Sequence, residues 1–162
     1  MSKIGIYPGT FDPMTNGHLN IIQRSLKVVD KLIIGVADNL NKKPLLSIDE
    51  RKNIIANDIY SLQQNNKKIE IHTVNGLLTE FSKKFDADCI IRGLRAVSDF
   101  EYEFQLAGMN KKLNSKIETM FLMSDVENQI ISSKFVKEIA SLGGNINRFV
   151  TKSTVKVLKD KI

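Results

Sequence analysis

The chain has 162 residues, 42% of them hydrophobic, and a formal net charge of +6. This length suits one domain with one core, and the apolar content excludes a wholly disordered chain. The single cysteine, Cys89, excludes an intramolecular disulfide and any multi-cysteine metal site, and no stretch is long and apolar enough for a transmembrane helix. With no signal peptide recognised at the first residues, we expect a cytoplasmic protein without a membrane partner.

Short apolar runs alternate with amphipathic stretches along the chain. The runs predict strands at residues 4–7, 32–37, 69–74, 89–91 and 120–123, and the stretches between them predict helices at 18–29, 47–62, 78–85, 99–113 and 132–142. A last basic helix is predicted within residues 152–162. The alternation predicts an α/β fold in which residues 1–162 form a single domain. That domain is a Rossmann-like parallel five-stranded sheet with helices on both faces.

The first loop, residues 8–18, follows the first strand and leads into a helix. Gly9 and Gly17 predict backbone conformations that a side chain would block and allow a ligand to come close. The free amides at the helix start, together with His18, favour an anion site, although an ordinary turn with a helix cap would use the same residues. No G-x-G-x-x-G follows the first strand and no G-x-x-x-x-G-K-[ST] is present, so dinucleotide-binding dehydrogenases and P-loop enzymes are disfavoured.

Three later segments also place cations or hydroxyls after a strand or at a helix start. Lys42 and Lys43 follow the second strand, where a lysine can reach over the sheet edge, or can simply be solvated. Arg92 and Arg95 follow the fourth strand, and forked guanidinium donors suit phosphate oxygens. Ser132 and its neighbour Ser133 precede a helix, as in an anion site or an ordinary cap. Ligands of parallel sheets bind at the carboxyl ends of strands, so these segments predict one phosphate site.

Four strings resemble the phosphopantetheine adenylyltransferases of the nucleotidyltransferase superfamily. They are Y-P-G-T-F-D-P at 7–13, T-N-G-H at 15–18, R-G-L-R-A-V-S-D-F-E-Y-E at 92–103 and I-S-S-K-F-V-K-E at 131–138. The resemblance implies transfer of AMP from ATP to 4′-phosphopantetheine, which gives dephospho-coenzyme A and pyrophosphate in coenzyme A biosynthesis. It also implies Mg²⁺ bound with ATP and a homo-oligomer, a hexamer in this family.

The resemblance carries roles to individual positions. It implies catalytic roles for Thr10, His18 and Lys42, and binding of the phosphopantetheine acceptor by Thr10, Lys42, Leu78 and Arg92. It implies ATP binding by Thr10, Phe11, His18, Gly93, Leu94, Arg95, Glu103, Asn128, Gln129, Ile130, Ile131, Ser132, Ser133 and Lys134. The sequence departs from the family pattern at Lys134, where a third serine is usual, and at Asn128 and Ile130, where aromatic residues are common.

Two other functions are compatible with parts of the sequence. The T-N-G-H motif alone would also suit a related nucleotidyltransferase that uses nicotinate mononucleotide or a cytidylyl donor, but the 92–103 string argues against it. The net charge would suit a nucleic-acid-binding module. Half of that charge, +3, lies within residues 152–162, and no aromatic stacking platform is present, so no nucleic-acid partner is expected.

Overall fold

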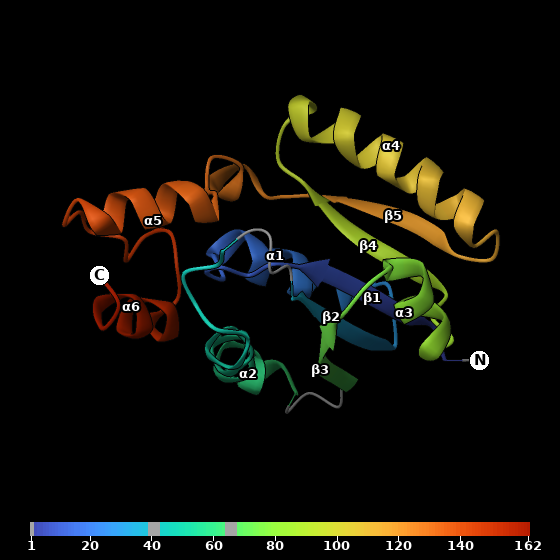
Figure 1. Cartoon of the computed structure of the whole chain (residues 1–162), viewed down its shortest axis with the longest axis horizontal. Coiled ribbons are helices and arrows are strands. Elements are labelled where there is room, and N and C mark those ends of the chain that lie inside the picture. The colour runs from blue at the N-terminus through green and yellow to red at the C-terminus, as the bar shows by residue number, and fades with distance from the viewer. Residues whose placement is uncertain (1, 39–42, 64–67) are drawn as a thin grey trace.

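The computed structural model describes residues 2–38, 43–63 and 68–162. Its centre is a five-stranded sheet with the strand order β3-β2-β1-β4-β5, in which every neighbouring pair is parallel (Figure 1). The strands are β1 (Ile4–Gly9), β2 (Lys31–Ala37), β3 (Lys68–Val74), β4 (Cys89–Leu94) and β5 (Glu118–Met123). The strands and the parallel sheet predicted from the apolar runs are therefore confirmed.

Helices connect the strands and continue beyond β5, as the amphipathic stretches predicted. They are α1 (Asn16–Ser25), α2 (Ile48–Gln63), α3 (Leu78–Lys84), α4 (Val97–Leu113), α5 (Ser133–Ser141) and α6 (Lys152–Lys159), with a short 3₁₀ turn, η2, at Val126–Asn128. Ser47 and Glu50 form a reciprocal capping box before α2, with N–H···O distances of 2.8 and 3.2 Å.

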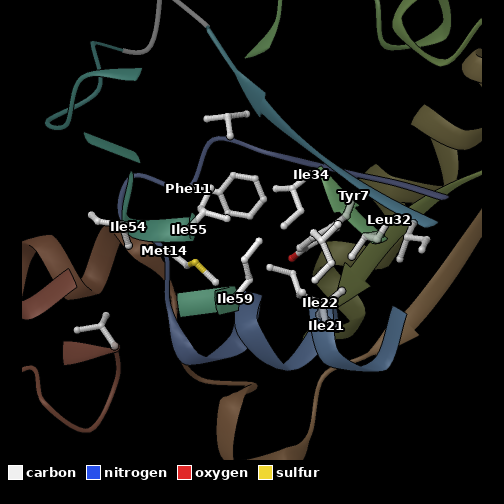
Figure 2. Packing of buried hydrophobic residues seen from close by; sticks show 14 of the residues in the cluster. Tyr7, Phe11, Met14, Ile21, Ile22, Leu32, Ile34, Ile54, Ile55 and Ile59 are labelled. Atoms are coloured by element: carbon white, nitrogen blue, oxygen red, sulfur yellow. The ribbon is translucent and has the colours of Figure 1, made fainter. Parts of the chain in front are cut away.

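Side chains of the strands alternate between two apolar layers, one on each face of the sheet. The larger layer packs strand residues against α1 and α2 (Figure 2); among its members are Tyr7, Leu32, Ile34, Ile91, Ile21, Ile22, Ile55 and Ile59. The smaller layer packs Ile6, Ile33 and Val74 against Phe81 of α3. Helices on both faces are therefore confirmed. Cys89 is 3% exposed, and burial raises the pKa of its thiol.

The C-terminal segment supports the first loop, a role that the sequence did not reveal. Thr154 is fully buried, and its hydroxyl donates to the carbonyl oxygen of Met14 at 3.1 Å. The backbone N–H of Asn16 donates to the carbonyl oxygen of Phe149 at 2.9 Å. The lysine-rich helix α6 is thus bound to the first loop through Thr154, and its Leu158, 1% exposed, belongs to the larger apolar layer. Within the described residues no helix combines the length and hydrophobicity needed to cross a bilayer.

Candidate active site

A pocket of about 500 Å³ lies at the carboxyl ends of β1 and β4. Its walls come from the loop after β1, the start of α1, the end of β4, α4 and the start of α5. The lining residues are Tyr7, Pro8, Gly9, Thr10, Phe11, Asp12, Thr15, Gly17, His18, Ile21, Pro44, Arg92, Gly93, Arg95, Asp99, Glu103, Ser124, Ile131, Ser132, Ser133, Lys134 and Lys137. The predicted meeting of the first loop, the arginine segment and the serine segment at one edge of the sheet is therefore found.

His18 is held by the cap of α1. The backbone N–H of Thr15 donates to Nδ1 of His18 at 3.0 Å, while the hydroxyl of Thr15 accepts from the backbone N–H of His18 at 3.4 Å. Together these bonds form a capping box in which histidine takes the usual place of glutamate. Because Nδ1 accepts a hydrogen bond from an amide, a neutral ring must carry its proton on Nε2. Burial, and to a lesser extent the positive charge of Arg95, lowers the pKa of His18 to about 4, so the ring is neutral near pH 7.

The unusual backbone of the first loop lies at Phe11 and not at the glycines. Phe11 has φ of 52°, whereas neither Gly9 nor Gly17 has a positive φ, so the prediction of special glycine conformations is wrong. Gly9 is needed for space instead, because a Cβ there would come within 2.9 Å of the Phe11 ring. The same ring, 1% exposed, meets the His18 ring edge-on at 5.1 Å between centroids. The Phe11 ring therefore packs against the His18 ring and limits its movement.

Asp12 joins three segments around the pocket. Its carboxylate, 5% exposed, accepts backbone N–H groups of Leu45 at 3.1 Å and Leu46 at 2.9 Å. It also accepts Lys137 Nζ of α5 at 2.6 Å. The two backbone N–H groups and the ammonium group compensate the buried negative charge of Asp12. Asp12 therefore holds the three segments together and is not available as a general base. Neither Asp12 nor Lys137 was predicted as a site residue, although both stand within the strings at 7–13 and 131–138, because the strings do not reveal that the two side chains pair.

Arg92 and Glu103 form one ion pair across the pocket wall. Nε and Nη2 of Arg92 donate to the two carboxylate oxygens at 2.6 and 2.5 Å, a bidentate arrangement. A third donor, Nη1, reaches the carbonyl oxygen of Pro8 at 3.3 Å. The side chains are 22% and 11% exposed. Arg92 and Glu103, predicted to contact different substrates, the acceptor and ATP, are therefore partners of each other here.

Arg95 is held in a more open pair. Its Nε and Nη2 donate to the carboxylate of Asp99 at 3.0 and 3.2 Å, and Nη1 donates to the carbonyl oxygen of Ile131 at 3.1 Å. The guanidinium therefore links β4 to the segment before α5. Between the two arginines, a Cβ on Gly93 would come within 3.0 Å of the Ile21 side chain, so glycine allows α1 to lie close to β4.

The serine segment closes the remaining wall of the pocket. Ser132 caps α5 by accepting the backbone N–H of Phe135 at 3.2 Å. The hydroxyl of Ser133 donates to the carbonyl oxygen of Pro13 at 2.7 Å, which ties α5 to the first loop. Lys134 lines the pocket with an exposed side chain, in the position where the family pattern has a third serine.

The remaining predicted residues that the structure describes lie outside the pocket lining. Leu94 is buried in β4 and its carbonyl oxygen accepts the backbone N–H of Ser124 at 2.8 Å. Leu78 packs at the start of α3 against the smaller apolar layer. Asn128 lies beside Gly17, because a Cβ added to Gly17 would be 3.7 Å from the Cβ of Asn128. Gln129 and Ile130 come next in the chain, and Ile130 is 80% exposed. Lys42 lies outside the described residues.

The chemistry of the pocket is that of an anion site. All three carboxylates of its lining are paired, Asp12 with Lys137, Asp99 with Arg95 and Glu103 with Arg92. Among the residues that the structure describes, no group of three or more His, Cys, Asp or Glu side chains could hold a metal ion. The surplus of donors over free acceptors suits a ligand that brings several negative oxygens, such as a triphosphate.

Residues 6–139 match the cytidylyltransferase-like family. The chain is 56% identical over 162 residues to the phosphopantetheine adenylyltransferase of Pelagibacter ubique, a match covering 99% of each protein. It is 53% identical to the enzyme of the same name from Rhodospirillum centenum, over 96% of this chain and 85% of that protein. A solved structure from Vibrio parahaemolyticus, described as a nicotinate-nucleotide adenylyltransferase, is similar with a TM-score of 0.72 at 18% sequence identity. The match covers 99% of this chain and 93% of that protein, so the two share the fold.

Proposed function

The chain belongs to the family of phosphopantetheine adenylyltransferases, and from this membership we infer that it transfers AMP from ATP to phosphopantetheine in coenzyme A biosynthesis. Phosphopantetheine carries a phosphate monoester, whose second pKa near 6 leaves it largely a dianion at neutral pH. One of its oxygens attacks the α-phosphorus of ATP. The bond from that phosphorus to the β-phosphate oxygen breaks, and pyrophosphate leaves.

Such a reaction needs positioned donors more than a general base, because the nucleophile is already ionised. The observation that best supports this site is one pocket that gathers His18, Arg92 and Arg95 while each of its carboxylates is already paired. We assign the Nε2 proton of His18 to an oxygen of the pentavalent centre. Being neutral, His18 donates a hydrogen bond without competing for the attacking dianion as a second cation would.

The other assignments follow the roles that the resemblance to the family implies. Thr10 and Lys42 complete the group at the α-phosphate, and Arg92 binds the acceptor phosphate together with Leu78. Arg95 and the N-terminal end of α5 bind the triphosphate, and Glu103 binds the ribose. Phe11, Gly93, Leu94 and residues 128–134 surround the remainder of ATP. Lys134 adds a charge where the family has a hydroxyl, so it is assigned to the phosphate end of the nucleotide.

Magnesium fits this site only as a companion of the nucleotide. Since Asp12, Asp99 and Glu103 are all engaged by cations, Mg²⁺ would be held by ATP oxygens and water, with no protein cage. Bound in that way, it supplies charge neutralisation on the triphosphate. Chelation by EDTA should abolish turnover while leaving the thermal unfolding temperature without ATP unchanged.

The decisive experiment mixes the purified protein with MgATP and 4′-phosphopantetheine and measures dephospho-coenzyme A by mass spectrometry and pyrophosphate by a coupled assay. Equal amounts of both products are expected. Nicotinate mononucleotide as acceptor, and CTP as donor, are the matched controls and should give little product. Faster pyrophosphate release with either control would contradict the proposed acceptor and donor.

We further propose that the enzyme is a cytoplasmic homohexamer. Several apolar side chains of α4 are exposed on the single chain, among them Val97, Tyr102, Phe104 and Met109 at 82%, 66%, 63% and 61%. Exposed apolar clusters of this kind usually mark an interface. Light scattering should give a mass near six times 18.3 kDa. A monomer at micromolar concentration would contradict the proposal, and Phe104→Asp should lower the mass of a true hexamer.

A further inference from the structure

Arg51 of α2 is a fully buried cation that has no place in the roles described so far. Only 1% of its surface is exposed, and it has the largest of the fully buried side chains. A guanidinium without water is costly to bury unless its donors are satisfied. Among the described residues its partners are backbone carbonyl oxygens and no carboxylate, so the residue is not half of an ion pair there.

The four carbonyl oxygens that accept from Arg51 in the described part of the chain belong to three separate segments. Nη1 donates to Thr10 in the first loop and to Ala37 at the end of β2, both at 2.9 Å. Nε donates to Leu46 at 3.1 Å and to Ser47 at 3.3 Å, just before α2. One planar group therefore fixes the loop after β1 to both flanks of the connection between β2 and α2.

Asp12 strengthens the same junction from the other side. Its carboxylate accepts the backbone N–H groups of Leu45 and Leu46, so Leu46 is bound through its N–H by Asp12 and through its carbonyl by Arg51. Thr10, whose carbonyl Arg51 holds, lines the pocket. The connection held at Ala37 and Leu46 carries Lys42. Thr10, one of the residues assigned to the α-phosphate, is thus bound directly by Arg51 through its carbonyl oxygen, as are Ala37 and Leu46.

We propose that Arg51 is a positioning residue for the transfer step, one that holds the backbone of Thr10 against Ala37 and Leu46 in the arrangement needed at the α-phosphate. This inference rests on the proposed function. Arg51 touches no substrate in this role. Its loss should therefore lower kcat more than it weakens ATP binding, because the ATP-binding donors of β4, α4 and α5 do not depend on it.

The sharpest variant is Arg51→Lys, which keeps the charge but replaces a planar fork by one ammonium group that cannot span the same carbonyl oxygens. Its matched control is Ile59→Ala, on the same helix and fully buried in the apolar layer. Both should lower the unfolding temperature. At a temperature well below both transitions, Arg51→Lys should lower kcat at least about tenfold, which is the effect expected when a reacting group is slightly misplaced. The Kd for ATP should change less than about threefold, which is well under 1.4 kcal/mol. Ile59→Ala should retain the kcat of the wild type.

Hydrogen exchange of the backbone supplies a readout that does not require turnover. Peptides covering residues 8–16 and 44–48 should exchange faster in Arg51→Lys than in Ile59→Ala. A kcat within twofold of wild type, an equal loss in Ile59→Ala, or unchanged exchange in those peptides would overturn the proposal. If the wild-type protein fails to use phosphopantetheine, the proposed function falls, and the exchange measurement alone decides whether Arg51 organises the pocket.

Discussion

His18 and Arg92 face the same pocket but are held in different ways. The ring of His18 is fixed by the backbone N–H of Thr15, three residues away within one helix cap. Arg92 is fixed by the carboxylate of Glu103, which belongs to a different element. A capping bond has no competing ligand, whereas a phosphate can compete with a carboxylate for the same guanidinium. The first loop therefore holds a donor in a fixed position for the reacting centre. In the β4–α4 segment, a substrate phosphate can replace the carboxylate that now binds the arginine.

The largest effect is expected from His18→Ala. Removing a preorganised donor at a developing charge typically lowers kcat by ~10²-fold or more, while the KM values for ATP and phosphopantetheine should change little. Steady-state pyrophosphate release would measure both. Thr15→Ala is the matched control, because it removes the capping hydroxyl and keeps the backbone N–H that orients the ring. Turnover of His18→Ala close to wild type would remove His18 from the mechanism and break the comparison.

A smaller effect on a different constant is expected from Arg92→Ala. Losing a charge-assisted contact worth ~1.5–3 kcal/mol should raise the KM for phosphopantetheine about tenfold or more. The kcat at saturating acceptor should fall much less. The variant also leaves the Glu103 carboxylate without its partner, so the unfolding temperature should drop and recover in Arg92→Ala/Glu103→Gln. Arg148→Ala, an exposed arginine outside the pocket, serves as the control. An unchanged acceptor KM would contradict the assignment.

Asp99→Asn probes the more exposed of the two arginine pairs. An amide accepts fewer of the bonds that Arg95 makes to the carboxylate through its backbone N–H, Nε and Nη2. Partly exposed pairs contribute roughly 0.2–1 kcal/mol, so the KM for ATP should rise about two- to fivefold. Steady-state pyrophosphate release at varied ATP would measure this KM, and competition of ATP against a fluorescent analogue would measure the matching rise in Kd. A larger shift for phosphopantetheine than for ATP would show that the two arginines divide the substrates differently.

The sequence predicted the sheet, the helices and most of the pocket because those depend on local pattern. Continuous apolar runs such as residues 32–37 and 89–91 specify buried parallel strands, and ligands of such sheets gather at one edge. What it missed depends on contacts between distant segments. Thr154 and Asp12 each bind backbone groups far away in sequence, which no periodicity encodes. Arg51 left one signal: with Ile48 and Ile55 it falls on the apolar face of α2, where a charge needs buried partners.

The strings shared with the family led to the site residues but did not reveal how those residues pair. Arg92 and Glu103 are eleven positions apart, and the strings assign them to different substrates, yet they meet because β4 and α4 pack together. The expectation for Gly9 and Gly17 failed for a related reason. Glycine reports either a special φ or a lack of space, and only the packed Phe11 ring distinguishes the two at Gly9.

The smallest effect on turnover is expected from pH. Because the pKa of His18 is lowered from 6.5 to about 4, the ring stays neutral and kcat at saturating substrates should vary less than about twofold between pH 7 and 9.

The free energy of unfolding should depend on pH instead. The unfolded chain protonates His18 near pH 6.5 and the folded chain only near 4, so the contribution of His18 to the free energy of unfolding is lost as pH falls between these values. In urea unfolding, wild type should lose about 2 kcal/mol more than His18→Gln between pH 7 and 5, since a tenfold difference in proton affinity corresponds to about 1.4 kcal/mol. Parallel pH dependences of the two proteins would show that the capping box does not keep the ring neutral, and His18 would then belong with the exchangeable cations of the β4–α4 segment.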